Sequence, residues 1–413
     1  MRLHPRLRAL PVLIGLCTLA GVRAGAQEKP RARDLGIPIG GTPGLLDAIT
    51  DVAGVEVGQT TIIRGDGRLV TGGGPVRTGV TAVLPRGKAS AEPVFAGWST
   101  LNGNGEMTGT TWLEESGMLW GPVMITNTLS VGLVRDAVIT WAVQHHFDTF
   151  DWALPVVAET WDEPLNDITG MHVSREDVVH ALDGARGGLP AEGNVGGGTG
   201  MICHEFKGGI GTASRRLPGS AGGYTVGVLV QCNYGSRRRL SVAGVPVGQE
   251  ITDLMPCVAI SDPATPWLRR APRCGEARTG SIVRPEGRNG SIIIVIATDA
   301  PLVSHQLKRV AKRAALGVGR MGGLGEDSSG DIFIAFSTAP AHAPGDSAVA
   351  HISMLTGERI DPLFEATVQA TEEAILNAML AAETMTGADG FRVYALPRDR
   401  LMAAMRKYGP RLP

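Results

Sequence analysis

The residues best suited to chemistry lie at one junction, where Gly290 and Ser291 come just before the run Ile-Ile-Ile-Val-Ile. A serine hydroxyl is a poor nucleophile until a base takes its proton. A cut before Ser291 would free an α-amine, with an ordinary pKa of about 7.7–8.0, as a base on the nucleophile's own residue. Glycine before the cut would let the backbone bend and expose its carbonyl to attack. A Gly-Ser pair before a strand is common, so this pattern alone has little specificity.

Other motifs typical of catalytic or nucleotide-binding sites either lack a required residue or lie in the wrong structural context. His204-Glu205 begins like the zinc-protease motif HExxH, but Gly208 stands where the second histidine is required. The glycine pattern at 317–322 matches a dinucleotide fingerprint, yet it follows a predicted helix, whereas the fingerprint follows a strand. We interpret it as a helix C-cap and turn. The glycine run at 196–200 lacks the lysine of a P-loop, and no GxSxG elbow occurs.

The elements that must position this junction can be read from hydrophobic pattern. Short apolar runs bounded by Gly, Asn, Asp or Pro predict buried strands at 123–126, 154–158, 224–230, 291–297 and 332–336. Helical spacing and capping residues predict helices at 131–147, 174–185, 304–316 and 361–383. Strands and helices alternate only loosely, so the pattern indicates an α+β fold with a mixed sheet system covered by helices.

The N-terminal segment 1–26 has the features of a secretory signal. Arg2, Arg6 and Arg8 precede an apolar stretch at 9–20 that is too short to span a bilayer, and Ala-Gly-Ala follows. We expect the mature chain to begin at Gln27 and to work in the periplasm or outside the cell. The net charge of −1 argues against nucleic acid or an anionic membrane as partner.

Four cysteines follow this segment, and none of them forms a CxxC motif, which disfavours a zinc knuckle or a thioredoxin-type centre. Cys257 and Cys274 lie in one loop-like stretch at 256–289 and could pair in an oxidising compartment. Cys203 and Cys232 lie beside apolar segments, and we expect them to be buried free thiols.

A resemblance to a known family covers nearly the whole mature chain, from Arg31 to about Met402. The stretches that carry it are RARDLGIPIGGTPG, NTLSVGLVRDAV, AETWDEPLND, GNVGGGTGMICHEFKGGIGTASR, VGVLVQCNYG, GSIIIVIATDAPL and SSGDIFIAFST. They resemble the L-aminopeptidase/D-esterase and β-peptidyl aminopeptidase family of self-processing enzymes. The resemblance implies a four-layer αββα sandwich, cleavage at Gly290-Ser291 into chains 27–290 and 291–413, and no metal or cofactor. It also implies a homo-oligomer, a tetramer of cleaved pairs.

The resemblance assigns catalytic roles to four positions. Ser291 would be the nucleophile of both self-cleavage and hydrolysis. Ser329 matches the family's second serine, which can relay protons beside the α-amine, and Asp331 matches an acidic residue that can orient it. Asn233 matches an asparagine that stabilises the oxyanion. Without the resemblance, Ser329 would be an ordinary turn residue and Asn233 part of a strand-end turn.

The expected substrates are short peptides, amides or esters with a free amine. Glu159 matches the carboxylate that binds the substrate ammonium, although by itself it could be a surface charge. Trp161 resembles the β-peptide-cleaving branch, whereas members acting on ordinary L-peptides tend to carry tyrosine there. Two alternatives stay open, which are an acyl transferase similar to ornithine acetyltransferase and an uncleaved periplasmic binding protein. The first group uses a nucleophilic threonine, which argues against it here.

Overall fold

The computed structural model describes residues 29–145, 154–276, 290–340 and 349–408. The predicted signal at 1–26, the expected new N-terminus at Gln27 and the segment just before Gly290 lie outside the described residues. Within the described part of the chain, no helix is long and apolar enough to cross a membrane.

A six-stranded sheet holds the Gly290-Ser291 junction at the beginning of one of its inner strands. Its strands, in spatial order, are β4 (Met118–Leu119), β3 (Val94–Gly103), β13 (Gly330–Ser337), β12 (Gly290–Thr298), β10 (Thr225–Tyr234) and β9 (Gly209–Arg216). Strands β12 and β13 are parallel, and the other neighbours are antiparallel. The strand that begins at the junction is therefore hydrogen-bonded on both sides.

A second sheet of four strands faces the first. It contains β1 (Glu56–Arg64), β2 (Val76–Leu84), β5 (Val123–Asn127) and β6 (Val156–Thr160), in that order. Strands β5 and β6 are parallel, so their carboxyl ends lie at the same edge. Buried side chains from both sheets form one apolar cluster between them, and β12 contacts β6 across it.

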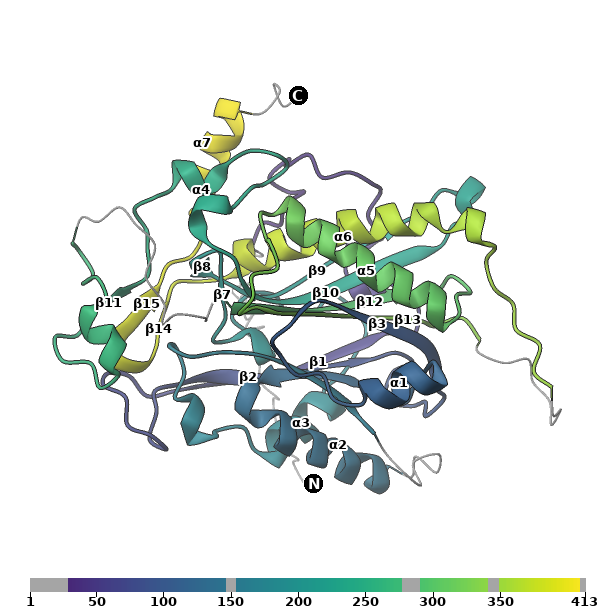
Figure 1. Cartoon of the computed structure of the whole chain (residues 1–413), viewed down its shortest axis with the longest axis horizontal. Coiled ribbons are helices and arrows are strands. Elements are labelled where there is room, and N and C mark those ends of the chain that lie inside the picture. The colour runs from purple at the N-terminus through teal and green to yellow at the C-terminus, as the bar shows by residue number, and fades with distance from the viewer. Residues whose placement is uncertain (1–28, 146–153, 277–289, 341–348, 409–413) are drawn as a thin grey trace, which may run out of the picture.

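Helices cover the outer face of each sheet, as Figure 1 shows. Helices α5 (Ser304–Arg320) and α6 (Asp361–Ala381) pack on the six-stranded sheet, while α2 (Val131–Gln144) and α3 (Arg175–Asp183) pack on the four-stranded sheet. The apolar run of β12 follows from this arrangement, because both of its faces are buried. Ile292 and Ile294 point toward the helices, and Ile293 and Val295 point toward the other sheet.

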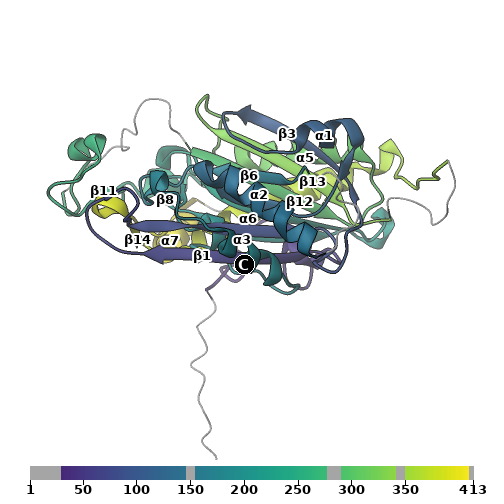
Figure 2. The same cartoon turned by 90° about the horizontal axis from the view of Figure 1, so that it is seen from below.

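The remaining elements lie around this framework. They are α1 (Thr110–Ser116), α4 (Val247–Glu250), α7 (Arg398–Tyr408), a hairpin of β7 (Ile202–Cys203) and β8 (Phe206–Lys207), and a small sheet of β11 (Cys257–Val258), β15 (Phe391–Val393) and β14 (Met385–Thr386). Figure 2, seen from below, shows α2 and α3 in front of the sheets and the β11–β14 region at one end.

The five predicted strands are all present, and Ser174 caps α3 as expected, since its Oγ accepts the Asp177 N–H at 3.2 Å. The helix predicted at 304–316 continues to Arg320. The predicted C-cap and turn at 317–322 is therefore confirmed only at its end, where Gly322 follows the helix with a φ of 96°, and it is wrong for Gly317. A Cβ on Gly317 would lie 2.6 Å from the Cβ of Thr371. The glycine therefore serves a close approach of α5 to α6 rather than a helix end.

Both cysteine pairs form disulfides in this structure. The predicted Cys257–Cys274 bridge is present, and Cys203 is bonded to Cys232. The expectation of buried free thiols was therefore wrong for Cys203 and Cys232. The hairpin β7–β8 folds back on the end of β10, where the N–H of His204 donates to the Tyr234 carbonyl at 2.7 Å, and this brings the two sulfurs together.

Candidate active site

Ser291 is the second residue of β12 and is buried, with 4% of its surface exposed. The strand register places it directly opposite Asn233 on β10 and directly opposite Gly330 on β13. Paired residues of neighbouring strands project from the same face of a sheet. The hydroxyl of Ser291 and the amide of Asn233 therefore share the face that looks toward β6.

Gly290 occupies a position that only glycine fits. Its φ is 100°, and a Cβ built there would lie 1.9 Å from the carbonyl oxygen of Asn233. Any side chain would push β12 away from β10 at the junction. The backbone of β10 therefore lies directly against the Gly290–Ser291 peptide.

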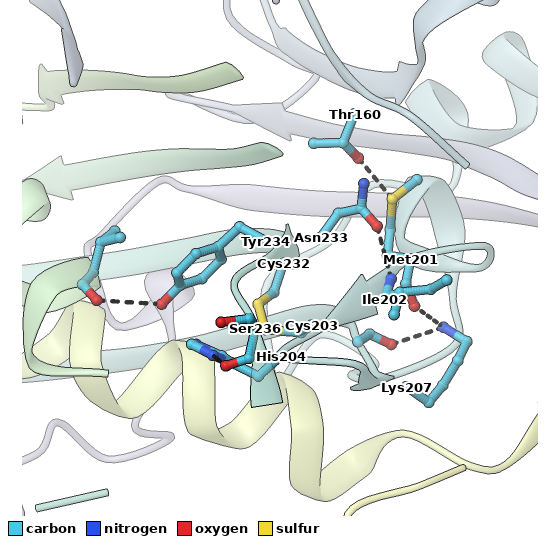
Figure 3. The surroundings of a disulfide bond; sticks show 12 residues. Thr160, Met201, Ile202, Cys203, His204, Lys207, Cys232, Asn233, Tyr234 and Ser236 are labelled. Atoms are coloured by element: carbon cyan, nitrogen blue, oxygen red, sulfur yellow. Dashed lines mark hydrogen bonds between the residues drawn. A yellow bond between two sulfur atoms is a disulfide. The ribbon is translucent and has the colours of Figure 1, made fainter. Parts of the chain in front are cut away.

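The side-chain amide of Asn233 is held in one orientation by two backbone groups, and Figure 3 shows the contact with one of them, the N–H of Ile202. Its Oδ1 accepts the Ile202 N–H at 2.7 Å, and its Nδ2 donates to the Trp161 carbonyl at 2.8 Å. An N–H can only donate and a carbonyl can only accept, so these partners fix which end of the amide is which. The second N–H of Nδ2 is then the one that can be directed toward Ser291.

Ser329 and Asp331 form a buried pair at the start of β13. The hydroxyl of Ser329 donates to Asp331 Oδ1 at 2.6 Å. Burial raises the pKa of Asp331 to about 6, although hydrogen bonds from Ser329 and from the Ile292 N–H act in the opposite direction. The carboxylate therefore lies one peptide away from the nitrogen of Ser291.

The Ser329–Asp331 pair and the hydroxyl of Ser291 lie on opposite faces of the six-stranded sheet. Asp331 is one residue beyond Gly330, so its side chain projects from the opposite face to Ser291 Oγ. The backbone nitrogen of Ser291 lies in the plane of the sheet and can be reached from that face. The pair is thus placed to act on the nitrogen of Ser291, while Asn233 is placed to act beside its hydroxyl.

Glu159 lies buried near the carboxyl end of β6, with 4% of its surface exposed. The N–H of Glu106 donates to its Oε1 at 3.0 Å, and the hydroxyl of Thr128 donates to its Oε2. Burial raises its pKa, while these two hydrogen bonds lower it. Among the described residues, no cation contributes to its electrostatic environment. A cationic group of a substrate would therefore complete this site.

Gly105 separates Glu159 from the beginning of β13. A Cβ on Gly105 would lie 3.2 Å from Glu159 Oε1 and 3.2 Å from the Cα of Gly330. The carboxylate of Glu159 is therefore one small residue away from the strand position that flanks Ser291. Trp161 follows β6 directly, is partly exposed, and has its carbonyl fixed by Asn233.

The sequence interpretation missed the residues that hold Glu159 and Asn233. Thr128 could have been found, because it follows the first of two predicted strands, at 123–126 and 154–158, that prove to be parallel neighbours. Glu106 and Ile202 contribute only backbone N–H groups, which carry no sequence signal. They become visible only once the chain is folded.

The patterns set aside in the sequence have structural roles. His204 and Glu205 are the two turn residues of the hairpin β7–β8, with φ of 49° and 58°. Such positive values at both central residues suit a tight hairpin turn. Within the described residues, no group of three or more His, Cys, Asp or Glu side chains is arranged to hold a metal ion.

Comparison with solved structures supports the same architecture. A β-aminopeptidase from a Burkholderia species is 46% identical, with a TM-score of 0.78 over 92% of this chain and all of that chain. The L-aminopeptidase D-Ala-esterase/amidase of Ochrobactrum anthropi, described as a variant of the Ntn hydrolase fold, is 46% identical. Its TM-score is 0.80 over 93% of this chain and all of that chain.

Curated relatives extend over almost the full length. The β-peptidyl aminopeptidase BapA of Sphingosinicella microcystinivorans is 53% identical over 96% of this chain and 97% of its own length. The enzyme of the same name from Sphingosinicella xenopeptidilytica is 48% identical over 98% and 97%. The model of peptidase family S58 matches residues 47–393. The chain therefore belongs to peptidase family S58, as the resemblance in its sequence indicated, and is a hydrolase of the aminopeptidase class.

Proposed function

We propose that the chain cleaves itself between Gly290 and Ser291 and that Ser291 then removes N-terminal residues from short peptides, amides or esters. The observation that carries this proposal is the position of Ser291 between Asn233 and Gly330, with Asp331 hydrogen-bonded one residue away. In that position the hydroxyl of Ser291 shares a sheet face with Asn233, and its nitrogen is one peptide away from the carboxylate of Asp331.

Self-cleavage begins when the Ser291 hydroxyl attacks the carbonyl carbon of Gly290. The hydroxyl proton passes to the nitrogen of Ser291, the C–N bond breaks as the acyl group moves from nitrogen to oxygen, and water then hydrolyses the resulting ester. The products are a Gly290 carboxylate and a Ser291 with a free amine and a free hydroxyl. The second N–H of Asn233 Nδ2 can stabilise the oxyanion of each tetrahedral intermediate, an effect typically worth about 3–4 kcal/mol.

Hydrolysis uses the same groups after the cut. The hydroxyl of Ser291 attacks the substrate carbonyl, and its own α-amine takes the proton and passes it to the leaving group. Water, deprotonated by the same amine, then releases the acyl group. A charged Asp331 stabilises the protonated amine, and Ser329, bound to that carboxylate, can pass or orient the proton.

The free amine of the substrate would bind Glu159. Its carboxylate already has two donors and lacks a cation among the described residues, so an ammonium group would balance its charge. Trp161 would form an apolar wall beside it. We infer that β-amino-acid residues are accepted, because relatives named β-peptidyl aminopeptidase share 53% and 48% of the sequence.

We further propose export through the segment 1–26 and work in the periplasm or outside the cell. The two disulfides support an oxidising compartment. The order of helices, sheet, sheet and helices supports a four-layer αββα sandwich whose cleaved chains stay together. Assembly into a tetramer of such pairs stays a prediction from the family resemblance.

The role of Glu159 gives a direct test of this function. We expect Glu159→Gln to lower kcat/KM for a β-aminoacyl amide about 10- to 100-fold, because a charge-assisted hydrogen bond to the ammonium is lost. The N-acetylated substrate is the matched control, and wild type should hardly cleave it. Equal activity of wild type on both substrates, or wild-type activity of Glu159→Gln, would contradict the proposed ammonium site.

A further inference from the structure

Lys207 of β8 is fully buried, which is rare for a lysine without a compensating partner. Its Nζ donates to the carbonyl oxygens of Met201 at 2.7 Å, Gly208 at 2.8 Å and Gly198 at 3.5 Å. Three carbonyls thus match the three N–H bonds of an ammonium group. Burial lowers the pKa of Lys207 well below its usual value, and no carboxylate among the described residues opposes that effect.

The Met201 carbonyl belongs to a peptide group that also contacts Asn233 of the proposed active site. The oxygen of Met201 and the nitrogen of Ile202 are parts of the same planar unit. Its oxygen accepts from Lys207 at 2.7 Å, and its N–H donates to Asn233 Oδ1 at 2.7 Å. Figure 3 shows this chain of contacts from the lysine to the asparagine.

We propose that Lys207 is a positioning residue that holds and polarises the Met201–Ile202 peptide, so that Asn233 presents its amide N–H to the oxyanion formed at Ser291. The inference rests on the function proposed above. Hydrogen bonds in such a chain strengthen one another by about 10–30% each. Electron density drawn from Asn233 Oδ1 makes the N–H bonds of its Nδ2 stronger donors.

The neighbouring contacts allow an effect of Lys207 on catalysis to be distinguished from an effect on the stability of the fold. The N–H of Gly208 also donates to the Met201 carbonyl, at 2.9 Å, and the Cys203–Cys232 disulfide ties the same hairpin to β10. The hairpin therefore keeps backbone and covalent anchors when the lysine amine is removed. What is lost is the side-chain donor, and with it the shorter of the two hydrogen bonds to the Met201 carbonyl.

The test compares Lys207→Met with wild type on self-cleaved protein, whose amount is fixed by intact mass. We expect kcat to fall about tenfold with KM within about twofold, because oxyanion donors act in the transition state. Thr199→Val is the matched control. It removes a buried hydrogen bond of 2.6 Å to the Gly196 carbonyl in the same segment without touching the Met201–Ile202 peptide, so kcat should stay near wild type.

A double-mutant cycle with Asn233→Ala tests whether the lysine acts through the asparagine. We expect Lys207→Met to lower kcat less than about twofold in the Asn233→Ala background, because the amide it serves is gone. If the methionine variant does not fold, the cycle is run with Lys207→Gln, whose neutral amide is a weaker donor than an ammonium group. We then expect a smaller loss of kcat that again disappears beside Asn233→Ala, and a loss that persists there would reject the role of Lys207.

Three outcomes would overturn the proposal. They are a folded Lys207→Met with wild-type kcat, a tenfold loss that persists unchanged beside Asn233→Ala, and an equal loss in Thr199→Val. A wild-type chain that neither cleaves itself nor hydrolyses the substrate would overturn the proposed function together with this inference. The first three outcomes leave the proposed function intact and reject only the role of Lys207.

Discussion

At the scale of residues, the site gives two atoms of one serine different neighbours. The hydroxyl of Ser291 shares a sheet face with Asn233, whereas its nitrogen lies beside the Ser329–Asp331 pair. An N-terminal nucleophile needs this separation, because oxygen must become an ester while nitrogen carries protons. In the proposed mechanism, the group that would stabilise the oxyanion and the pair that would tune the amine can therefore be changed independently.

The pKa of the α-amine should depend on Asp331. Above about pH 6 the carboxylate is charged, and a nearby negative charge raises the pKa of an amine. In Asp331→Asn that charge is missing, so the amine loses its proton at lower pH. We expect the acidic limb of kcat/KM to move down by about one pH unit, with a lower maximum rate.

The pH profile of kcat/KM, measured from about pH 5 to 9, checks this shift across the ordinary amine range. Asp327→Asn is the matched control, since Asp327 is exposed in the turn before β13 and its loss removes the same charge. An acidic limb that stays in place in Asp331→Asn, or moves equally in the control, would contradict the assignment.

At the scale of elements, the sequence predicts the strands but not their neighbours. The runs at 291–297 and 332–336 are visible because β-branched, aromatic and other apolar residues fill strands buried on both faces. Their parallel pairing, and the pairing of β10 with β12, depend on contacts between distant segments. The link between Ser329 and Asp331 was expected only from the family resemblance and is present as a hydrogen bond. The disulfide of Cys203 was missed because the hairpin that places it has only a local turn signal.

The backbone at the junction should not tolerate a side chain. In Gly290→Ala, the new Cβ would lie 1.9 Å from the Asn233 carbonyl, and the residue would keep an unfavourable φ of 100°. We expect self-cleavage to slow at least tenfold, because a shift of the order of an ångström can cost about 10²-fold in rate. The cut fraction on a denaturing gel, followed over time, measures this.

Gly244→Ala is the control that distinguishes backbone strain at a positive φ from a steric clash of the new Cβ. Gly244 also has a positive φ, 82°, but a Cβ there meets no atom within 4 Å. It should cleave like wild type. If Gly290→Ala cleaves at the wild-type rate, the close packing of β10 against the junction is not part of the mechanism.

The two disulfides should differ in their effect on catalysis. Cys232 is the residue before Asn233, and Cys203 follows Ile202, whereas Cys257 and Cys274 lie near the small sheet. Removing either bridge with paired alanines should cost about 2–4 kcal/mol of unfolding free energy. We expect only the Cys203/Cys232 pair to lower kcat as well. Equal kcat values for the two double variants, measured below their melting temperatures, would contradict this distinction.

At the scale of the whole molecule, a cut at Gly290 would divide one sheet between two chains. Strands β12 and β13 and helices α5 and α6 would belong to 291–413, while β3, β9 and β10 would belong to 27–290. The apolar clusters on both faces contain residues of both parts. The cleaved chains should therefore stay associated under native conditions and separate only on denaturation.

The most direct test of the account is the intact mass of denatured protein after expression, for wild type and for Ser291→Ala. We expect two wild-type masses, matching Gln27–Gly290 and Ser291–Pro413, and one uncut mass for Ser291→Ala. A wild-type chain that stays whole would lack the proposed base and contradict the account, as would a Ser291→Ala chain that is cut at the same bond.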